Sequence, residues 1–319
     1  MYKNLCISLS ILLSMLLLFQ SCKKEAALVA SDQNIGYTVP QGNHPYDKTI
    51  VDFYSKYGVY LLYKFSDKDT YWTPLGWKNS VLSTTTANFW STGYLATQAD
   101  TTSSDYITRQ LVVLNKLWFG FYSDKFLKQF LPVKIMLCNT VDSVYSKVVS
   151  FGPPITYARV DTYVGAWYNY DNLCVGYGNS SAATMAQKDS IAFAKKVNFI
   201  FMQSIITRNL SAPTADFTAI TNYGVTYTST ATAYTAGIIA PYSGVTSQLD
   251  WAQYMQAMVT CTEATLNKSQ ANTISSFTGI LNVTKDTNGK IRQRYNIVRN
   301  YFINNYGVDL QAIGNYAGR

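Results

Sequence analysis

Residues 190–209 read SIAFAKKVNFIFMQSIITRN, the stretch with the strongest helical pattern in the chain. Apolar side chains recur at intervals of three and four residues, as they do on one face of an α-helix. These side chains are Phe193, Val197, Ile200, Phe201 and Ile205. We predict a long helix here, and because it is the most apolar helical segment of the sequence, we expect it to lie in the core.

The rest of the sequence predicts further helices and strands and contains no internal repeats. Helical spacing also predicts helices over residues 48–57, 105–121, 248–261 and 290–305. Runs of aliphatic, β-branched and aromatic residues predict strands over residues 59–65, 133–138 and 173–177. Residues 216–241, rich in Thr, Tyr, Ala and Gly, are expected to be irregular. The pattern indicates an α+β protein with one domain over residues 46–319.

The composition is that of a folded protein with very little histidine. Of the 319 residues, 48% are hydrophobic and 15% aromatic, which is ample for a packed core and opposite to a disordered chain. The one histidine, His44, excludes any catalytic or metal site that needs two imidazoles. We expect His44 to be a solvated side chain in a linker, which also argues against Ser-His-Asp and Cys-His catalysis.

The net charge of +8 reflects few acidic residues more than many basic ones. The basic residues are scattered along the chain, whereas a nucleic-acid-binding surface requires them to cluster on one face. We therefore expect no nucleic-acid partner.

The N-terminus has the pattern of a secretory signal that ends in a lipidation site. A short basic start, MYKN, precedes an apolar run over residues 5–19, which is too short to span a membrane. The run ends in FQSC, a lipobox-like sequence, so we predict a signal peptide over residues 1–21 and an acylated Cys22. Residues 22–45 are polar and broken by Gly and Pro, and we predict a flexible tether there.

Three cysteines remain once Cys6 is assigned to the leader and Cys22 to the lipid anchor. Cys138, Cys174 and Cys261 are odd in number and show no C-x-x-C spacing, so neither a disulfide framework nor a zinc knuckle is indicated. One pair could form in an exported protein, and the sequence leaves open which.

Four stretches together resemble a known family. They are YDKTI to YGVYLLYKF over residues 46–65, FLPVKIML over 130–137, IAPYS and LDWAQY within 239–254, and 290–310, which ends NYGVDL. Their order is similar to that of the substrate import-associated zinc metallohydrolase lipoproteins, metallopeptidases anchored to Gram-negative outer membranes. This resemblance implies a zincin-like metallopeptidase fold, a single domain with a long central helix and a small mixed sheet.

The resemblance also implies partners and a location. The family is encoded beside TonB-dependent import systems and their substrate-capturing lipoproteins, so a transporter and a capturing lipoprotein are the expected partners. The protein should be lipid-anchored in the outer membrane, on its periplasmic or its cell-surface face.

The chain differs from this family at the residues that bind zinc and activate water. Family members carry H-E-x-x-H on the long helix, with two imidazoles that bind zinc and a Glu that activates water. The resemblance places Gln203 and Thr207 at the histidine positions and Ser204 at the Glu position. A later acidic motif supplies the family's third ligand, and here it reads LDWAQ over residues 249–253, which keeps one acid, Asp250, and lacks the flanking acids. Gln and Thr are poor zinc ligands, and Ser is no general base near neutral pH.

We therefore expect a zinc metallopeptidase homologue without bound zinc, with no catalytic residues and no cofactor. The former active-site cleft becomes the candidate ligand-binding site, with one set of lining residues: Gln203, Ser204, Thr207, Asp250 and Gln253. Its role would be substrate binding, or an accessory part in nutrient import. Two alternatives stay open: a peptidase or glycosidase with a carboxylate-based site in the same cleft, and a purely structural lipoprotein.

Aromatic residues suggest a peptide or glycan as the ligand. Tyr and Trp rings pack against sugar rings or peptide side chains while their polar tips form hydrogen bonds. The densest segment is YVGAWYNY over residues 163–170, and Trp72, Trp77 and Trp90 add to the excess. The competing interpretation is that these rings are ordinary core and surface residues.

Overall fold

The computed structural model describes residues 37–70, 93–169 and 171–318. Contacts divide the chain into two units, Met1–Tyr37 and Thr38–Arg319, and the second unit is described below. The predicted leader, Cys22, and the tryptophans Trp72, Trp77 and Trp90 lie outside the described residues.

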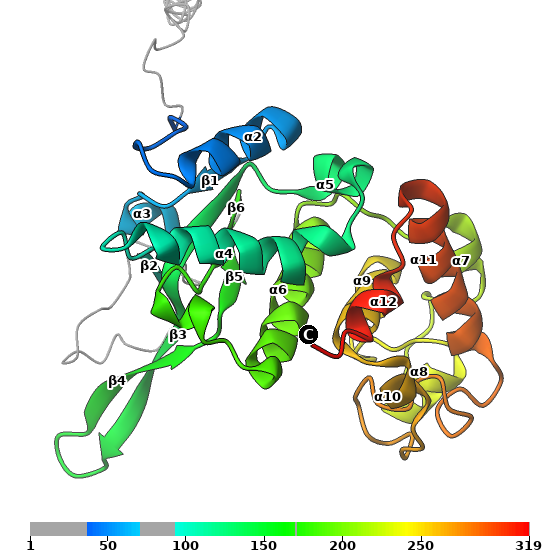
Figure 1. The fold of residues 1–319 in the computed structure, drawn as a ribbon. Helices are drawn as coiled ribbons and strands as arrows, with labels where there is room; N and C mark the ends of the chain where they lie inside the picture. The colour runs from blue at the N-terminus through cyan, green and yellow to red at the C-terminus, as the bar shows by residue number, and fades with distance from the viewer. Residues whose placement is uncertain (1–36, 71–92, 170, 319) are drawn as a thin grey trace, which may run out of the picture. The chain divides into compact units, whose positions relative to one another are not determined.

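A mixed sheet forms one part of this unit (Figure 1). Its strands β1 (Tyr60–Leu62), β3 (Lys134–Ser150), β6 (Asn172–Val175) and β5 (Ala166–Tyr168) lie side by side in that order. β1 and β6 each run parallel to β3, and β5 pairs with β6 antiparallel. The first half of β3 is therefore covered on both edges, and its apolar residues 135–138 are completely buried.

The second half of β3 leaves this group and pairs with two further strands. β2 (Gly93–Gln98) and β4 (Thr156–Tyr163) both run antiparallel to it, and β3 and β4 form a long hairpin. The strands predicted over residues 133–138 and 173–177 are thus confirmed, but the first is much longer than predicted. The sequence patterns predict none of β2, β4 and β5, because these strands are short or polar and are defined by pairing with β3 and β6.

Helices α2, α4 and α5 come from the first half of the chain. α2 (Asp47–Tyr57) ends at Gly58, whose φ of 70° suits the left-handed turn that stops a helix. α4 (Ser104–Leu117) and α5 (Asp124–Phe130) each begin at a serine that caps a backbone N–H. The buried side-chain amide of Gln110 in α4 donates to the carbonyl of Cys138 within β3 and to the carbonyls of Val175 and Gly176 at the end of β6, which fixes the helix on the sheet.

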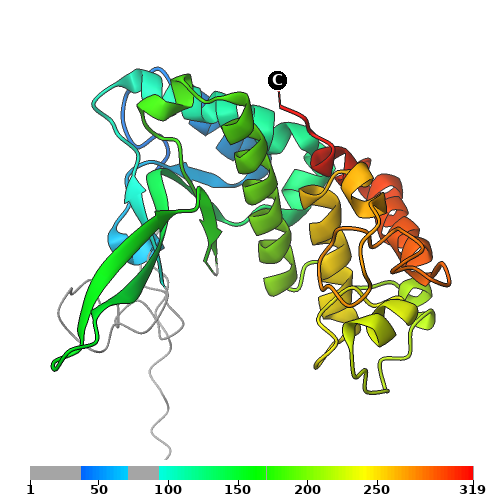
Figure 2. The same cartoon turned by 90° about the horizontal axis from the view of Figure 1, so that it is seen from below.

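The predicted helix over residues 190–209 is α6 (Gln187–Thr207), with 21 residues. It contacts β5 and, on another face, α9 (Ser247–Thr260), as both views show (Figures 1 and 2). α11 (Lys290–Tyr306) and α12 (Leu310–Gly314) pack on α9. A Cβ at Gly314 would lie 2.1 Å from the Met258 carbonyl oxygen, so only glycine allows α12 to approach α9 this closely.

Short helices complete the unit, and two of them lie in the segment expected to be irregular. They are α3 (Asp67–Thr70), η3 (Phe119–Phe121), η4 (Ser180–Ala183), α7 (Ala215–Ala219), α8 (Thr230–Thr235) and α10 (Glu263–Asn267). The mixed α and β content agrees with the predicted class. Within the described residues, none of the helices combines the length and apolarity needed to cross a bilayer.

The end of the predicted tether is packed rather than free. The unit begins at Thr38, and the Gln41 side chain accepts hydrogen bonds from the backbone N–H groups of Tyr63 and Lys64. His44 stacks on Tyr46, with ring centroids 4.8 Å apart, and its Nδ1 lies 3.2 Å from an oxygen of Asp47. The expectation of a solvated linker side chain for His44 is therefore wrong, because contacts with residues distant in sequence hold this segment in place.

The three cysteines of the described region are free thiols. Cys138 and Cys174 are buried on the adjacent strands β3 and β6, whereas Cys261 ends α9. Burial raises the pKa of the Cys138 thiol well above its usual value, which keeps the sulfur protonated and unreactive.

Candidate functional site

Gln203 and Thr207 lie one turn apart on α6, so their side chains project from the same face of the helix. Gln203 is half-buried, and its Oε1 is buried with no hydrogen-bond partner among the described residues. Thr207 is exposed, and its hydroxyl donates to the Tyr168 hydroxyl of β5 at 3.2 Å. This face of α6 thus offers an unpaired amide oxygen and a hydroxyl beside the edge strand.

Ser204 points into the protein instead. It is 1% exposed, and its hydroxyl oxygen accepts a hydrogen bond from Nε of Arg208 at 3.1 Å. Arg208 also donates to the carbonyls of Phe130 and Leu131, so it ties the end of α6 to the end of α5. Ser204 therefore has a structural partner and cannot reach a ligand in this conformation.

Asp250 is likewise held inside the protein. It is completely buried, and its Oδ1 accepts hydrogen bonds from the backbone N–H groups of Ile239 and Ala240, both at 2.9 Å. Its Oδ2 forms an ion pair with Arg294 of α11, itself completely buried, and accepts a hydrogen bond from the Tyr223 hydroxyl at 3.0 Å. Burial raises the pKa of Tyr223, so this phenol stays protonated and donates.

With every oxygen of Asp250 engaged, the expected role of this residue as a lining group of an open cleft has no support in the geometry. A carboxylate with two backbone donors, a hydroxyl donor and a guanidinium has no free lone pair directed at solvent. Asp250 instead anchors residues 239–240 and α11 to the start of α9.

Gln253 lies one turn along α9 from Asp250 and is half-buried. Its side-chain amide donates to Oε1 of Gln256, one turn further on, at 3.2 Å. In the described region, no hydrogen bond joins Gln253 to Gln203 or Thr207. The structure thus places Gln203, Thr207 and Gln253 on two helices that pack together, and assigns Ser204 and Asp250 to internal contacts.

These donors do not fit the zinc site of an H-E-x-x-H protein. Zinc prefers imidazole, thiolate and carboxylate ligands, whereas the positions in question offer two amides and a hydroxyl. The one histidine is bound to Asp47 at the start of the unit. Across the described residues, no group of three His, Cys, Asp or Glu side chains is placed to hold a metal ion.

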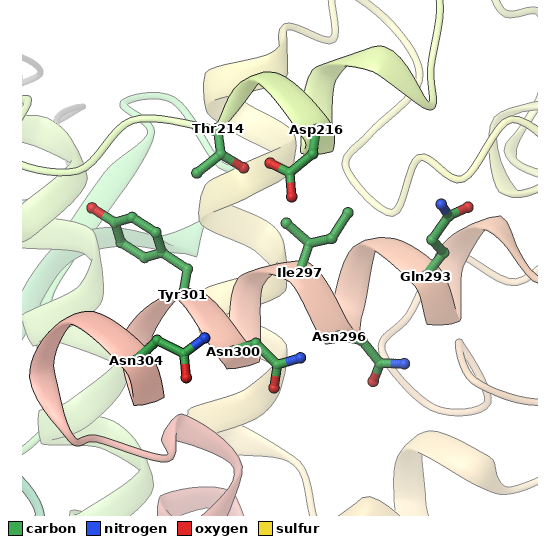
Figure 3. Close-up of a pocket in the computed structure, with 8 residues that line it drawn as sticks. All are labelled: Thr214, Asp216, Gln293, Asn296, Ile297, Asn300, Tyr301 and Asn304. Atoms are coloured by element: carbon green, nitrogen blue, oxygen red, sulfur yellow. The ribbon is translucent and has the colours of Figure 1, made fainter.

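Three cavities lie away from the predicted site residues. One, of about 560 Å³, lies between α11 and the start of α7 (Figure 3). Two others, of about 330 and 370 Å³, share Tyr163 and Tyr177 beside the N-terminal half of α6. None of these three cavities is lined by a predicted site residue.

The aromatic segment divides between surface and packing roles. Tyr163 is 48% exposed and forms a wall of two cavities. Trp167 stacks on Tyr94 with ring centroids 3.5 Å apart, and the Lys196 ammonium lies 5.7 Å from its ring. Trp118 and Trp251, outside this segment, are buried in the hydrophobic core. The sequence alone gave no way to separate these groups.

Part of the chain matches a described family. Residues 169–311 match the family model named putative zinc-binding metallo-peptidase, a stretch that includes all of α6, α9 and α11. This stretch resembles that family. The resemblance inferred from the sequence is confirmed to this extent, since residues 46–65 and 130–137 lie outside the match.

One solved structure is similar to the chain. It is the crystal structure of a putative zinc-binding metallo-peptidase from Bacteroides caccae, with 13% sequence identity and a TM-score of 0.44. The similarity covers 84% of this chain and 88% of the other. No curated protein matches the sequence.

Proposed function

We propose that this protein is a zincin-like member of the zinc-binding metallo-peptidase family that has exchanged catalysis for binding. In this proposal it is a lipoprotein, anchored in the outer membrane through Cys22. It serves as a substrate-binding or accessory component beside a TonB-dependent transporter and a substrate-capturing lipoprotein. The family match over residues 169–311 supports the relationship, because it includes the two helices on which family members carry their metal ligands.

The proposed lack of catalysis rests on the residues that α6 carries at the positions of the family's zinc ligands and general base. The two family histidine positions hold Gln203 and Thr207 on one face, and the position of the family's general base holds Ser204, which is buried against Arg208. A buried serine hydroxyl bound by a guanidinium cannot accept a proton from water near neutral pH. The unpaired Oε1 of Gln203 supports binding, because a buried amide oxygen without a partner is costly until a ligand donates to it.

The carboxylate-based hydrolase is the weaker alternative. Such an enzyme needs an accessible acid in the cleft, and Asp250 is completely buried in its ion pair. A glycosidase needs two carboxyl groups on opposite sides of a bound sugar, and Asp250 is the one acid among the five predicted site residues.

The first test is the zinc content of the full-length protein, purified in detergent with zinc present and measured by mass spectrometry. We expect far less than one zinc per chain. The matched variant carries Gln203→His together with Thr207→His, which places two imidazoles at i and i+4 on the exposed face of α6. We expect this variant to bind zinc measurably, because that spacing suits one metal ion.

Two outcomes would contradict the proposal. One zinc per wild-type chain would mean that other side chains form a metal site, and the hydrolase would become the better interpretation. Proteolysis of casein that is lost in Asp250→Asn without loss of folding would have the same meaning.

The binding role is tested separately. Gln203→Ala and Gln253→Ala should weaken capture of the transporter or the capturing lipoprotein from solubilised membranes.

A further inference from the structure

The cavity between α11 and the start of α7 has no role in the function proposed above. It is a groove of about 560 Å³ between the outward face of α11 and the residues that begin α7 (Figure 3). Two residues of the α7 segment and six of α11 line it: Thr214, Asp216, Gln293, Asn296, Ile297, Asn300, Tyr301 and Asn304. None of them belongs to α6 or α9, so this groove is separate from the α6–α9 site.

A row of amide side chains follows α11 along the groove. Gln293, Asn296, Asn300 and Asn304 are exposed, and in the described part of the chain none of their side-chain amides forms a hydrogen bond. Figure 3 shows Asn296, Asn300 and Asn304 along one edge of the helix. Each of these three is four residues from the next, which corresponds to a repeat of about 6 Å.

The other wall supplies a negative charge. Asp216 is exposed, and within the described residues its carboxylate forms no ion pair and accepts no hydrogen bond. It is the one charged residue that lines the groove. Beside it, Oγ1 of Thr214 is buried without a hydrogen-bond partner in that same part of the chain, although the residue precedes a helix whose N–H groups it could cap. The exposed Asp216 carboxylate is therefore available to donors from a ligand.

An apolar floor lies between the two walls. Ile297 and Tyr301 are half-buried, and in Figure 3 their side chains extend from α11 toward Thr214 and Asp216. The Tyr301 ring packs edge-on against Trp251, with ring centroids 5.4 Å apart, and this contact holds Tyr301 in position. An occupant would thus meet amides along one edge, an apolar strip in the middle and a carboxylate opposite.

We propose that this groove binds an extended peptide segment that carries a basic side chain. An Asn amide presents one donor group and one acceptor, the same pair that a main-chain peptide unit presents, so each amide can pair with one unit. Alternate units of an extended chain repeat every 6.6–6.8 Å or so, close to the roughly 6 Å of the amide row. The row from Gln293 to Asn304 is about 16 Å long, enough for about five extended residues.

The charge of the groove favours a basic segment. Asp216 can form a hydrogen-bonded ion pair with a Lys or Arg side chain of the peptide, whereas an acidic side chain would be repelled. The other lining residues are neutral, so recognition of the main chain by the amides and of one cation by Asp216 together define the ligand.

The test is fluorescence anisotropy with labelled octapeptide TKTKTKTK and the full-length protein in detergent. We expect saturable binding that weakens at least tenfold when alternate peptide nitrogens are methylated, because methylation removes the main-chain donors. Asn300→Ala combined with Asn304→Ala should weaken binding at least tenfold. Asp216→Asn should weaken it about threefold or more, and TETETETE should bind at least tenfold more weakly.

Matched controls separate this proposal from the function proposed above. Asn305→Ala changes an exposed amide on the same helix that does not line the groove, and Gln203→Ala changes the α6 site, so both should bind TKTKTKTK as the wild type does. Absence of saturable binding, or equal binding of the methylated peptide, would overturn the proposal. Binding of cellohexaose in preference to the peptide, lost in the double Asn variant, would identify a glycan groove instead.

Discussion

The buried pair of Arg294 and Asp250 shows how a partner that is distant in sequence can change the role expected of a residue, here Asp250. Their ion pair joins α11 to the start of α9, and both side chains are completely buried. Arg294 also lies over the Phe217 ring, 3.7 Å from its centroid, and donates to the Gly237 carbonyl at 2.6 Å. Asp250, which the resemblance assigns to a former metal-binding motif, thus holds three segments together inside the protein.

We expect Arg294→Met to reduce the free energy of unfolding by about 3–5 kcal/mol, because it leaves the buried Asp250 carboxylate without its counter-charge. Asp250→Asn should also destabilise, and both effects are measured by urea unfolding. As a control, Asp52→Asn breaks the exposed Lys48–Asp52 pair and should cost less than about 1 kcal/mol. If Asp250→Asn left stability intact and abolished partner binding, Asp250 would be a ligand-binding residue after all.

Lys285 is the second buried charge with a consequence for stability. It is 1% exposed, and its Nζ donates to Gln270 Oε1 at 2.8 Å and to the Ser276 carbonyl at 3.0 Å. Burial lowers its pKa to about 8. The folded protein therefore releases this proton at a lower pH than the unfolded chain does.

Because the folded state binds the proton more weakly, stability should rise with pH from about 8 towards the unfolded pKa near 10.4. Relative to Lys285→Met, the wild type should gain about 1–2 kcal/mol between pH 8 and 9.5, measured as the difference between their urea unfolding free energies. The exposed Lys188 provides the control, since Lys188→Met should show no such difference from wild type. A flat difference across this range would mean that Lys285 is not buried in solution.

At the scale of elements, the helices follow closely from local sequence. α2, α4, α6, α9 and α11 all lie within a few residues of their predicted ranges, because apolar spacing, serine or threonine caps and a terminal glycine are local signals. The strands were harder to predict. β4 is half exposed and polar, and its partner β3 identifies it as a strand.

The two candidate sites are also only partly predictable from the sequence. The sequence shows Gln203, Ser204 and Thr207 on one helix without any His or Glu, and it shows the spacing of Asn296, Asn300 and Asn304. That Ser204 turns inward, and that the Asn row meets Asp216 across a groove, depends on how α6 and α11 pack against other elements.

At the scale of the whole molecule, the proposed function depends on the lipid anchor proposed at Cys22. If Cys22 is acylated, full-length protein should be found in the outer-membrane fraction, and Cys22→Ala should move it to the soluble periplasmic fraction. Each methylene group of the acyl chain that is buried in the membrane contributes about 0.8 kcal/mol to the free energy of membrane binding, and this contribution is lost without the chain. Cys261→Ala, outside the predicted lipobox, should remain in the membrane fraction. Equal fractionation of wild type and Cys22→Ala would contradict the anchor.

The sequence by itself determined the positions of the main helices, the mixed α and β class, and the absence of His and Glu from the helix over residues 187–207. These are properties of residue type and local spacing. Tertiary structure alone decided that Asp250 pairs with Arg294, that residues 38–45 pack on the domain, and that α11 faces Asp216 across a groove. The reason is physical: burial and ion pairing depend on which residues distant in sequence come together, and local spacing carries no information about that choice.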